Sequence, residues 1–455
     1  MKKYLGWILL LPLLIYGCFY HISSSEFWPM TISKTWWNWS FFEPSQLQKP
    51  LFSFFLSFFH ILPLSDLTHI YFVKFAFSLL GIVALYIFIK SAIEISQKQI
   101  THNKLILIAL LFCLFSPIFL KNFSRIRSDQ VGFLFFILSV YFYLIRRMRL
   151  SFLFAILLPI SSIKSILFFI PLAFIILPQY LSYFKKLNFI KKLNLTLLTL
   201  AALVWAIGYN LSALSYLIAT YQDASFPTVY LKNFVTVEMP FILLSILTSL
   251  WILLNKRLRL IPYALASLSS LALIVAIPQS YSYYIASFVP IVYLPLLTVL
   301  IQYGFQYKKV FVTTLSLCLL YSSIMMWKKN LPYFISSCPQ ILFISKASAL
   351  TNLHGFNYLD GMGMLPRQNL IPCFASPSDP IANNGCREAL ENQPDVIIIT
   401  QRLLELGNES FKVAAENYFQ VYPNYWVHQK YKEEVEIKKG DLDNLPVPLI
   451  IFMVD

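Results

Sequence analysis

Residues 68–89, THIYFVKFAFSLLGIVALYIFI, decide the fold class of this chain. An apolar run of about 20 residues is long enough to cross the hydrocarbon core of a bilayer as one helix. Comparable runs lie on both sides of it, so the sequence predicts an all-α polytopic membrane protein. We expect about eleven spans, near residues 5–21, 68–89, 104–120, 130–146, 151–163, 165–182, 195–219, 235–254, 260–277, 284–303 and 309–327.

Basic residues alternate with the apolar runs up to residue 327, where the pattern stops. The whole chain has 36 Lys and Arg, 21 Asp and Glu and a formal net charge of +15, with 58% hydrophobic and 13% charged residues. An excess of Lys and Arg in alternate loops is typical of cytoplasmic loops. Here those loops contain Lys2 and Lys3; Lys90, Lys98 and Lys104; Arg146, Arg147 and Arg149; Lys185, Lys186, Lys191 and Lys192; Lys256, Arg257 and Arg259; Lys308 and Lys309.

This pattern predicts a cytoplasmic N-terminus and an extracytoplasmic C-terminal region. It explains the net charge without a nucleic-acid partner. The first segment, MKKYLGWILLLPLLIYG, begins like a secretory signal, but no small-x-small cleavage site follows it, so we expect an uncleaved first span.

The chain is expected to have two domains: 1–327, transmembrane, and 328–455, an extracytoplasmic soluble α/β domain. The outer loop 22–67 is rich in Trp and Phe and is predicted to carry interface helices. In the tail, QILFIS, DVIIIT and PLIIFMV favour strands, whereas CREALEN and ESFKVAAENYF have helical spacing. Three cysteines lie in this domain, Cys338, Cys373 and Cys386; the last two are closest in sequence, but all three pairings remain open.

Carboxylates are scarce before residue 328, which narrows the search for a catalytic base. They are Glu26, Glu43, Asp66, Glu94, Asp129, Asp223 and Glu238. Asp129 follows Arg125 and Arg127 at the start of a predicted span, where it fits either a functional site or the N-cap of a helix. Glu26 lies just after the first span, where a solvated loop carboxylate is the simpler interpretation by position alone.

Two lysines lie where the alternation of charge predicts the outer face. Lys49 precedes Pro50 and a run of aromatic residues, and Lys164 separates two apolar segments. Each fits a contact with a lipid phosphate, or a side chain that reaches the lipid headgroups without any catalytic task.

Five stretches together resemble the GT-C type of membrane glycosyltransferase, which uses polyprenyl-phosphate-linked sugars and includes protein O-mannosyltransferases and lipid A aminoarabinose transferases. The resemblance covers roughly residues 1–300. The stretches are SEFWPMTISK (25–34), LQKPLFSFF (47–55), RSDQVGFLFF (127–136), SSIKSILFFIPL (161–172) and YSYYIASFVPIVYLPLL (281–297).

Two departures from the family pattern stand out. The family's Asp-Glu pair is represented here by Ser25 and Glu26. The resemblance implies that the missing acid is the general base, so Glu26 or Asp129 takes that role, or activity is altered or lost. The basic residue often found before the proline of the tenth span is replaced by tyrosines, namely Tyr281, Tyr283 and Tyr284.

The resemblance implies an enzyme that transfers a sugar from a polyprenyl phosphate to a lipid, glycan or protein at the outer face of a bacterial cytoplasmic membrane. Glu26 or Asp129 would be the base, and substrate would be bound by Lys49, Arg125, Arg127, Lys164 and Tyr284. Trp28, Trp36 and Trp37 fit contacts with sugar or isoprenoid, although interface anchoring explains most of them. We expect no metal and no cofactor.

Two other classes of function stay open. A lipid or solute transporter would show Gly- or Pro-broken spans in repeated halves, whereas this chain has only 12 glycines and no evident repeat. A catalytically inactive relative would bind polyprenyl lipid without turnover, and Ser25 keeps this alternative open.

Overall fold

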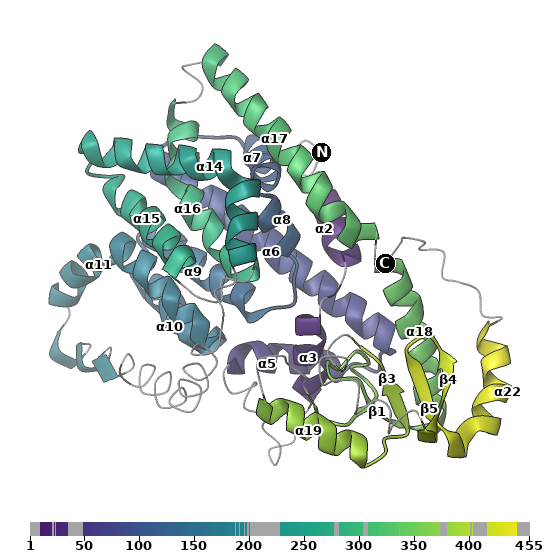
Figure 1. The fold of residues 1–455 in the computed structure, drawn as a ribbon. Coiled ribbons are helices and arrows are strands. Elements are labelled where there is room, and N and C mark those ends of the chain that lie inside the picture. The colour runs from purple at the N-terminus through teal and green to yellow at the C-terminus, as the bar shows by residue number, and fades with distance from the viewer. Residues whose placement is uncertain are drawn as a thin grey trace. The chain divides into compact units, whose positions relative to one another are not determined.

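The structure is a computed structural model. It describes residues 10–20, 22, 24–34, 49–186, 188–190, 192–194, 196–197, 200, 228–276, 282–303, 308–335, 337–373, 380–400, 403 and 416–443. These residues are mostly helical and include one small sheet (Figure 1). The chain divides into two compact units: unit 1 is residues 1–18, 48–52 and 75–331, and unit 2 is residues 19–47, 53–74 and 332–455.

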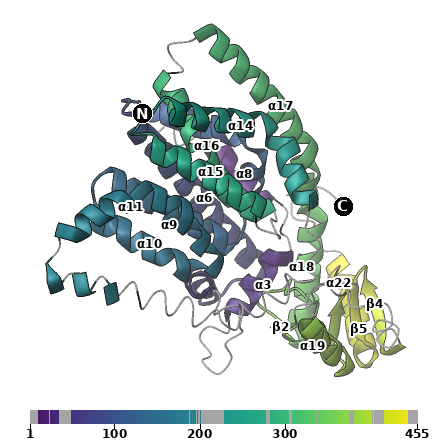
Figure 2. The ribbon, with the colours of Figure 1, turned by 60° about the vertical axis from the view of Figure 1, so that its left-hand side comes forward.

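Unit 1 is a helical assembly. Figures 1 and 2 show α14, α15 and α16 side by side, and α9 beside α10. Its helices are α2 (Leu11–Phe19, up to Cys18), the first turn of α5 (Pro50–Ser57), α6 (Asp66–Ser96, from Phe75), α7 (His102–Phe115), α8 (Pro117–Asn122), α9 (Ser128–Leu144), α10 (Met148–Ser161), η3 (Ile163–Phe168), α11 (Phe169–Lys186), α14 (Thr228–Leu254), α15 (Ile261–Ala276), α16 (Ser282–Tyr303) and α17 (Lys308–Ile335, up to Leu331).

The surface of unit 1 carries apolar side chains at helical spacing. On α14, Leu243, Leu247, Leu250 and Leu254 are all exposed, while the opposite face contributes Phe241 and other side chains to the buried core. Exposure of such a continuous apolar stripe to water is unfavourable, so this face of the helix is suited to contact with lipid. A second stripe on α17 contains Leu317, Leu320, Ile324 and Trp327.

Three described helices are long and apolar enough to cross a membrane: Asp66–Ser96, Phe234–Leu254 and Ile285–Tyr303. These helices coincide with three of the predicted spans. Their length and apolar composition support the prediction of a helical membrane protein. The predicted span at 104–120 is not one continuous helix, because α7 ends at Phe115 and α8 begins at Pro117. The predicted span at 195–219 lies almost entirely outside the described residues.

Unit 2 combines segments of the N-terminal part of the chain with the C-terminal region. Its helices are α3 (Ser24–Ile32), the rest of α5, η2 (Phe58–His60), the first turns of α6, α18 (Ser337–His354), α19 (Pro380–Glu391), η4 (Gln429–Tyr431) and α22 (Lys432–Asp443). Its strands are β1 (Asn357–Leu359), β2 (Asn369–Leu370), β3 (Val396–Ile398), β4 (Tyr418–Tyr422) and β5 (Tyr425–His428).

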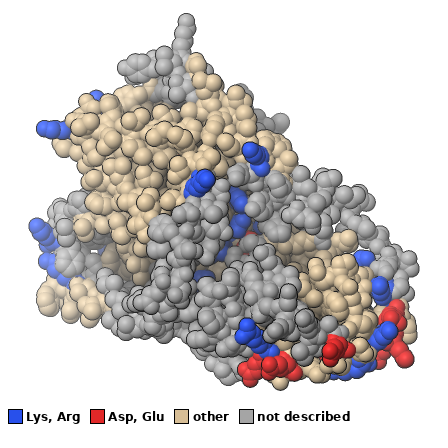
Figure 3. Space-filling view, viewed as in Figure 1, with Lys and Arg blue, Asp and Glu red and all other residues tan. Residues whose placement is uncertain are grey.

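The strands form one mixed sheet in the order β2-β1-β3-β5-β4. β1 pairs in parallel with β2 and β3, with Tyr358 opposite Val396, and β5 runs antiparallel to β3 and β4. A disulfide joins Cys373 to Cys386 beside a small core that includes Leu359 and Ile397. In Figure 3 the acidic side chains in view gather over α19 and α22, whereas the visible face of unit 1 is largely uncharged.

Predictions for the tail are confirmed in part. DVIIIT contains β3, and CREALEN lies mainly in α19. The strand predicted at QILFIS is wrong, because these residues belong to α18; Ile344, Ala347 and Thr351 are buried at intervals of three and four, the spacing of one helix face. The helix predicted for ESFKVAAENYF is wrong at its end, which enters β4. PLIIFMV lies outside the described residues.

Candidate functional site

A pocket in unit 1 brings together three of the residues singled out from the sequence. Arg125 and Arg127 lie on the connection between α8 and α9, and Asp129 lies in the first turn of α9. The pocket holds about 320 Å³ of empty space, including the part open to solvent at its mouth. The other described residues that line it are Phe119, Asn122, Phe123, Gln130, Phe133, Ala286 and Ser287.

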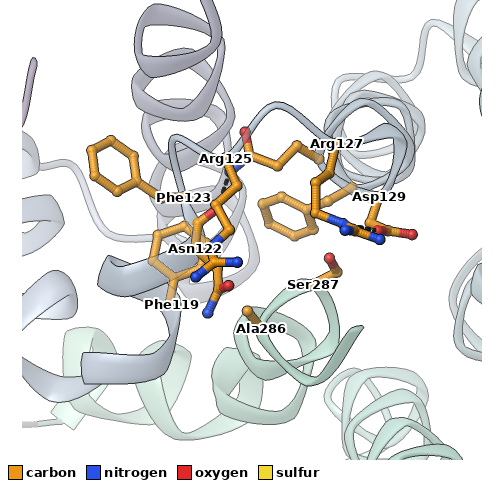
Figure 4. Close-up of a pocket in the computed structure, with 10 residues that line it drawn as sticks. Phe119, Asn122, Phe123, Arg125, Arg127, Asp129, Ala286 and Ser287 are labelled. Atoms are coloured by element: carbon orange, nitrogen blue, oxygen red, sulfur yellow. Dashed lines mark hydrogen bonds and ion pairs between the residues drawn. The ribbon is translucent and has the colours of Figure 1, made fainter. Parts of the chain in front are cut away.

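Backbone hydrogen bonds hold the connection between α8 and α9 in a compact conformation. The Asn122 carbonyl accepts from the Arg125 N–H (3.2 Å) and the Arg125 carbonyl from the Arg127 N–H (2.9 Å). The Gln130 side chain also donates to the Asn122 carbonyl, which ties α9 back to α8. These bonds bring the two arginines, which are two residues apart, to one pocket (Figure 4).

Two glycines allow the connection to lie close to neighbouring helices. A Cβ at Gly81 of α6 would collide with the carbonyl oxygen of Phe123, and one at Gly17 of α2 would meet the side chains of Ser78 and Ser124. Since the obstacle at Gly81 is backbone, no side-chain rotation relieves it. The course of this pocket wall therefore depends on a glycine at position 81.

The charged groups of the pocket are largely withdrawn from water. Arg127 Nε donates to Asp129 Oδ2 at 3.2 Å, and Arg125, Arg127 and Asp129 are 9%, 8% and 6% exposed. Ser128 begins α9, as expected, but the N-cap position is Arg127 and makes no side-chain capping bond. Asp129 pairs with Arg127 instead of acting as the cap.

The pocket has the chemistry of an anion site. Its described lining residues include two guanidinium groups and one carboxylate, so positive charge predominates among them. Guanidinium groups match the planar oxygen pairs of phosphate, and the N-terminus of α9 adds a favourable dipole. Figure 4 shows Ser287 of α16 facing the Arg127–Asp129 pair, which places a hydroxyl group on the opposite wall.

Glu26 is not the solvated loop carboxylate that its position suggested. It lies in α3 of unit 2, where its Oε1 is 3.8 Å from Lys74 Nζ, and both side chains are 0% exposed. Lys74 was missed from the sequence. The available signal was a single lysine inside the apolar run 68–89, where an ionisable residue deserves a functional or structural reason.

Asp66 and His60 form a second polar cluster in unit 2. Asp66 accepts hydrogen bonds from the Arg367 N–H, the Gln368 side chain and the Ser348 hydroxyl, at 2.5–2.6 Å. His60 Nε2 lies 2.7 Å from the Met30 carbonyl oxygen, which can only accept. Burial lowers the pKa of His60 to about 4, so the ring is neutral near pH 7.

The other predicted site residues are placed as follows. Lys49 immediately precedes α5 and is half-buried, and Trp28 is buried in α3 rather than exposed. Lys164 lies in η3 and Tyr284 in α16, but their side chains are outside the described part of the structure. Tyr281, Trp36, Trp37, Glu43 and Asp223 are also outside it.

Among the described residues, no group of three or more His, Cys, Asp and Glu side chains is arranged to hold a metal ion. Comparison of the chain with protein-family models, curated proteins and solved structures finds no significant match. The pocket and the sequence pattern are therefore the features that bear on function.

Proposed function

We propose that the protein is an integral membrane glycosyltransferase that takes a sugar from a polyprenyl phosphate and passes it to a lipid, glycan or protein. The observation that carries this proposal is the pair of buried guanidinium groups beside Asp129 in one pocket. A lipid-linked sugar phosphate needs cations for its phosphate and a base for the acceptor hydroxyl, and this pocket offers both kinds of group.

In the proposed reaction the acceptor oxygen bonds to the anomeric carbon of the sugar. The bond from that carbon to the phosphate oxygen breaks, and the polyprenyl phosphate leaves with the electron pair. Arg125 and Arg127 stabilise the charge on the departing phosphate, and Asp129 takes the acceptor proton. Asp129 is preferred to Glu26 as the base because it shares the pocket with the arginines.

We further propose about eleven spans, a cytoplasmic N-terminus and an extracytoplasmic C-terminal region. The alternation of basic loops supports this orientation. The disulfide between Cys373 and Cys386 also supports it, because disulfides persist in oxidising compartments. The apolar stripes of α14 and α17 support contact of these two helices with lipid.

Transfer of radiolabelled sugars from a panel of polyprenyl phosphates, in membranes containing the wild type, Asp129→Asn or Glu26→Gln, tests the proposal. We expect transfer that Asp129→Asn abolishes. Loss in Glu26→Gln alone, at equal protein level, would instead assign the base to Glu26. Absence of transfer while a polyprenyl phosphate still binds would favour the inactive relative.

One observation favours a transporter as a second candidate. The α7–α8 segment is broken at Ser116, and broken helices line the substrate sites of many transporters. At this break, however, the chain's own Glu238 accepts from Ser116 and Ile118 and occupies the position that a substrate would take. Movement of a fluorescent lipid across proteoliposomes, with no sugar transfer, would support transport.

A further inference from the structure

Glu238 is a fully buried carboxylate inside an apolar helix, α14. Its Oε1 accepts from the Ser116 hydroxyl and the Ile118 N–H, both at 2.9 Å, and its Oε2 accepts from the Tyr293 hydroxyl at 2.7 Å. Both oxygens are therefore engaged by the chain itself. Burying an ionisable residue in a membrane helix costs free energy, so its presence indicates a structural or functional role. Here that role involves three elements: α14, α8 and α16.

The first task is to fix the start of α8. A helix leaves its first N–H groups without partners inside the helix. At the break between α7 and α8, Glu238 accepts from Ile118 and the Ser116 hydroxyl accepts from the Phe119 N–H at 3.2 Å. The Ser116 hydroxyl joins the two by donating to Glu238.

Hydrogen bonds continue from this point to the pocket. The Ile118 carbonyl accepts from Asn122 Nδ2 at 2.7 Å, and the Asn122 carbonyl accepts from the Gln130 side chain. Asn122 and Gln130 both line the pocket. A continuous series of bonds thus leads from Glu238, through α8, to the wall that carries the arginines.

The other oxygen of Glu238 accepts from the helix that also forms the opposite wall. Tyr293 belongs to α16, and the same helix presents Ala286 and Ser287 to the pocket (Figure 4). Glu238 therefore holds α8 and α16, two elements that face each other across the pocket. It is not itself among the residues that line the pocket.

We infer that Glu238 is a positioning residue that sets the affinity of the pocket for phosphate-bearing lipids through its hydrogen bonds to Ser116, Ile118 and Tyr293. This inference rests on the proposed function and deepens it. A purely electrostatic effect would have the opposite sign, because removal of a carboxylate strengthens anion binding. The two mechanisms are therefore distinguishable by the direction of the change.

Binding of farnesyl phosphate to the full-length protein in detergent provides the test, with farnesol as the phosphate-free probe. We expect Glu238→Ala to weaken farnesyl phosphate binding about tenfold, with farnesol binding unchanged. Glu238→Gln should bind like the wild type, because its amide oxygen accepts from Ser116 and Ile118 and its NH₂ group donates to the Tyr293 oxygen. Ser116→Ala and Tyr293→Phe should each show a smaller loss of the same sign, which keeps the test valid should Glu238→Ala not fold.

Ser267→Ala is the matched control. The Ser267 hydroxyl donates to the Val292 carbonyl at 2.6 Å, so this change removes a buried bond between α15 and α16 without touching α8. It should lower the melting temperature and leave binding unchanged. Wild-type affinity in Ser116→Ala and Tyr293→Phe, or stronger binding in both Glu238 variants, would overturn the inference. Equal binding of farnesyl phosphate and farnesol by the wild type would instead overturn the proposed function.

Discussion

The pocket of unit 1 and the Asp66 cluster of unit 2 use similar residues in opposite ways. In the cluster, the Asp66 carboxylate accepts from a backbone N–H, an amide and a hydroxyl of the chain, so both of its oxygens have fixed hydrogen-bond partners. In the pocket, Asp129 faces a lining with two guanidinium groups. The cluster is a structural junction, whereas the two guanidinium groups among the described lining residues of the pocket suit an anionic ligand.

A buried charged residue is informative about function only together with the partners that surround it. Asp66 and Asp129 are two of the seven acids before residue 328, and both lie in the first turn of a helix. A change in the pocket should therefore affect ligand binding first, and a change in the cluster should affect stability first.

Arg125→Gln should reduce sugar transfer about 100-fold, because one of the two groups that stabilise the departing phosphate is lost. Initial rates in membranes at equal protein level measure this. Arg367→Gln, in unit 2, is the matched control and should retain wild-type transfer. Transfer within twofold of wild type in Arg125→Gln would remove the pocket from the proposed mechanism.

Asp66→Ala should lower the free energy of unfolding of the protein by about 3 kcal/mol, since it leaves buried donors without their acceptor. Thermal unfolding followed by tryptophan fluorescence measures the change. Asp66→Asn keeps one acceptor oxygen and should cost less. An unchanged melting temperature in the alanine variant would contradict the structural role of this cluster.

Stability should fall by about 2 kcal/mol between pH 7 and pH 5 because of His60. Burial, with smaller contributions from Arg367 and Lys34, lowers its folded pKa to about 4. The unfolded ring, with a pKa of about 6.5, therefore binds a proton across a range in which the folded ring does not, so stability falls as the pH falls from 6.5 towards 4. His60→Gln should reduce the slope of melting temperature against pH without abolishing it, because His69, whose buried ring lies 4.5 Å from that of His60, remains. An unchanged slope would refute the assignment.

Asp395→Asn should change stability by less than about 1 kcal/mol. Its ion pair with Lys430 measures 3.1 Å, but the lysine side chain is 50% exposed, and exposed pairs contribute little. The melting temperature in low and high salt measures the effect. A larger loss that persists in high salt would show that the Tyr431 hydroxyl and the Asn357 N–H, which also donate to Asp395, contribute more than the lysine.

The sequence predicted the features that depend on neighbouring residues. Arg125, Arg127 and Asp129 line one pocket because they lie within five consecutive residues and so stay close in space. Strand β3 forms from a run of β-branched residues that is visible in the sequence. QILFIS was misjudged because its six residues were considered without the nine helical residues that follow, over which the helical spacing becomes visible.

Features that depend on packing could not be predicted. The partners of Glu26 and Glu238, Lys74 and Tyr293, are distant in sequence and belong to apolar runs. The helices that carry them are apolar on nearly every side, so periodicity does not say which faces meet. The sequence could show that an acid lies in a span, but not which donors surround it.

The contact between Gly81 and the Phe123 carbonyl gives a way to recognise relatives of this chain. Any side chain at position 81 would displace the pocket wall, so proteins that keep the pocket are expected to keep this glycine. Such a glycine, combined with an Arg-x-Arg-Ser-Asp sequence some forty residues further on, is a compact signature. Genomes searched for that pair could reveal distant homologues that whole-chain similarity does not detect.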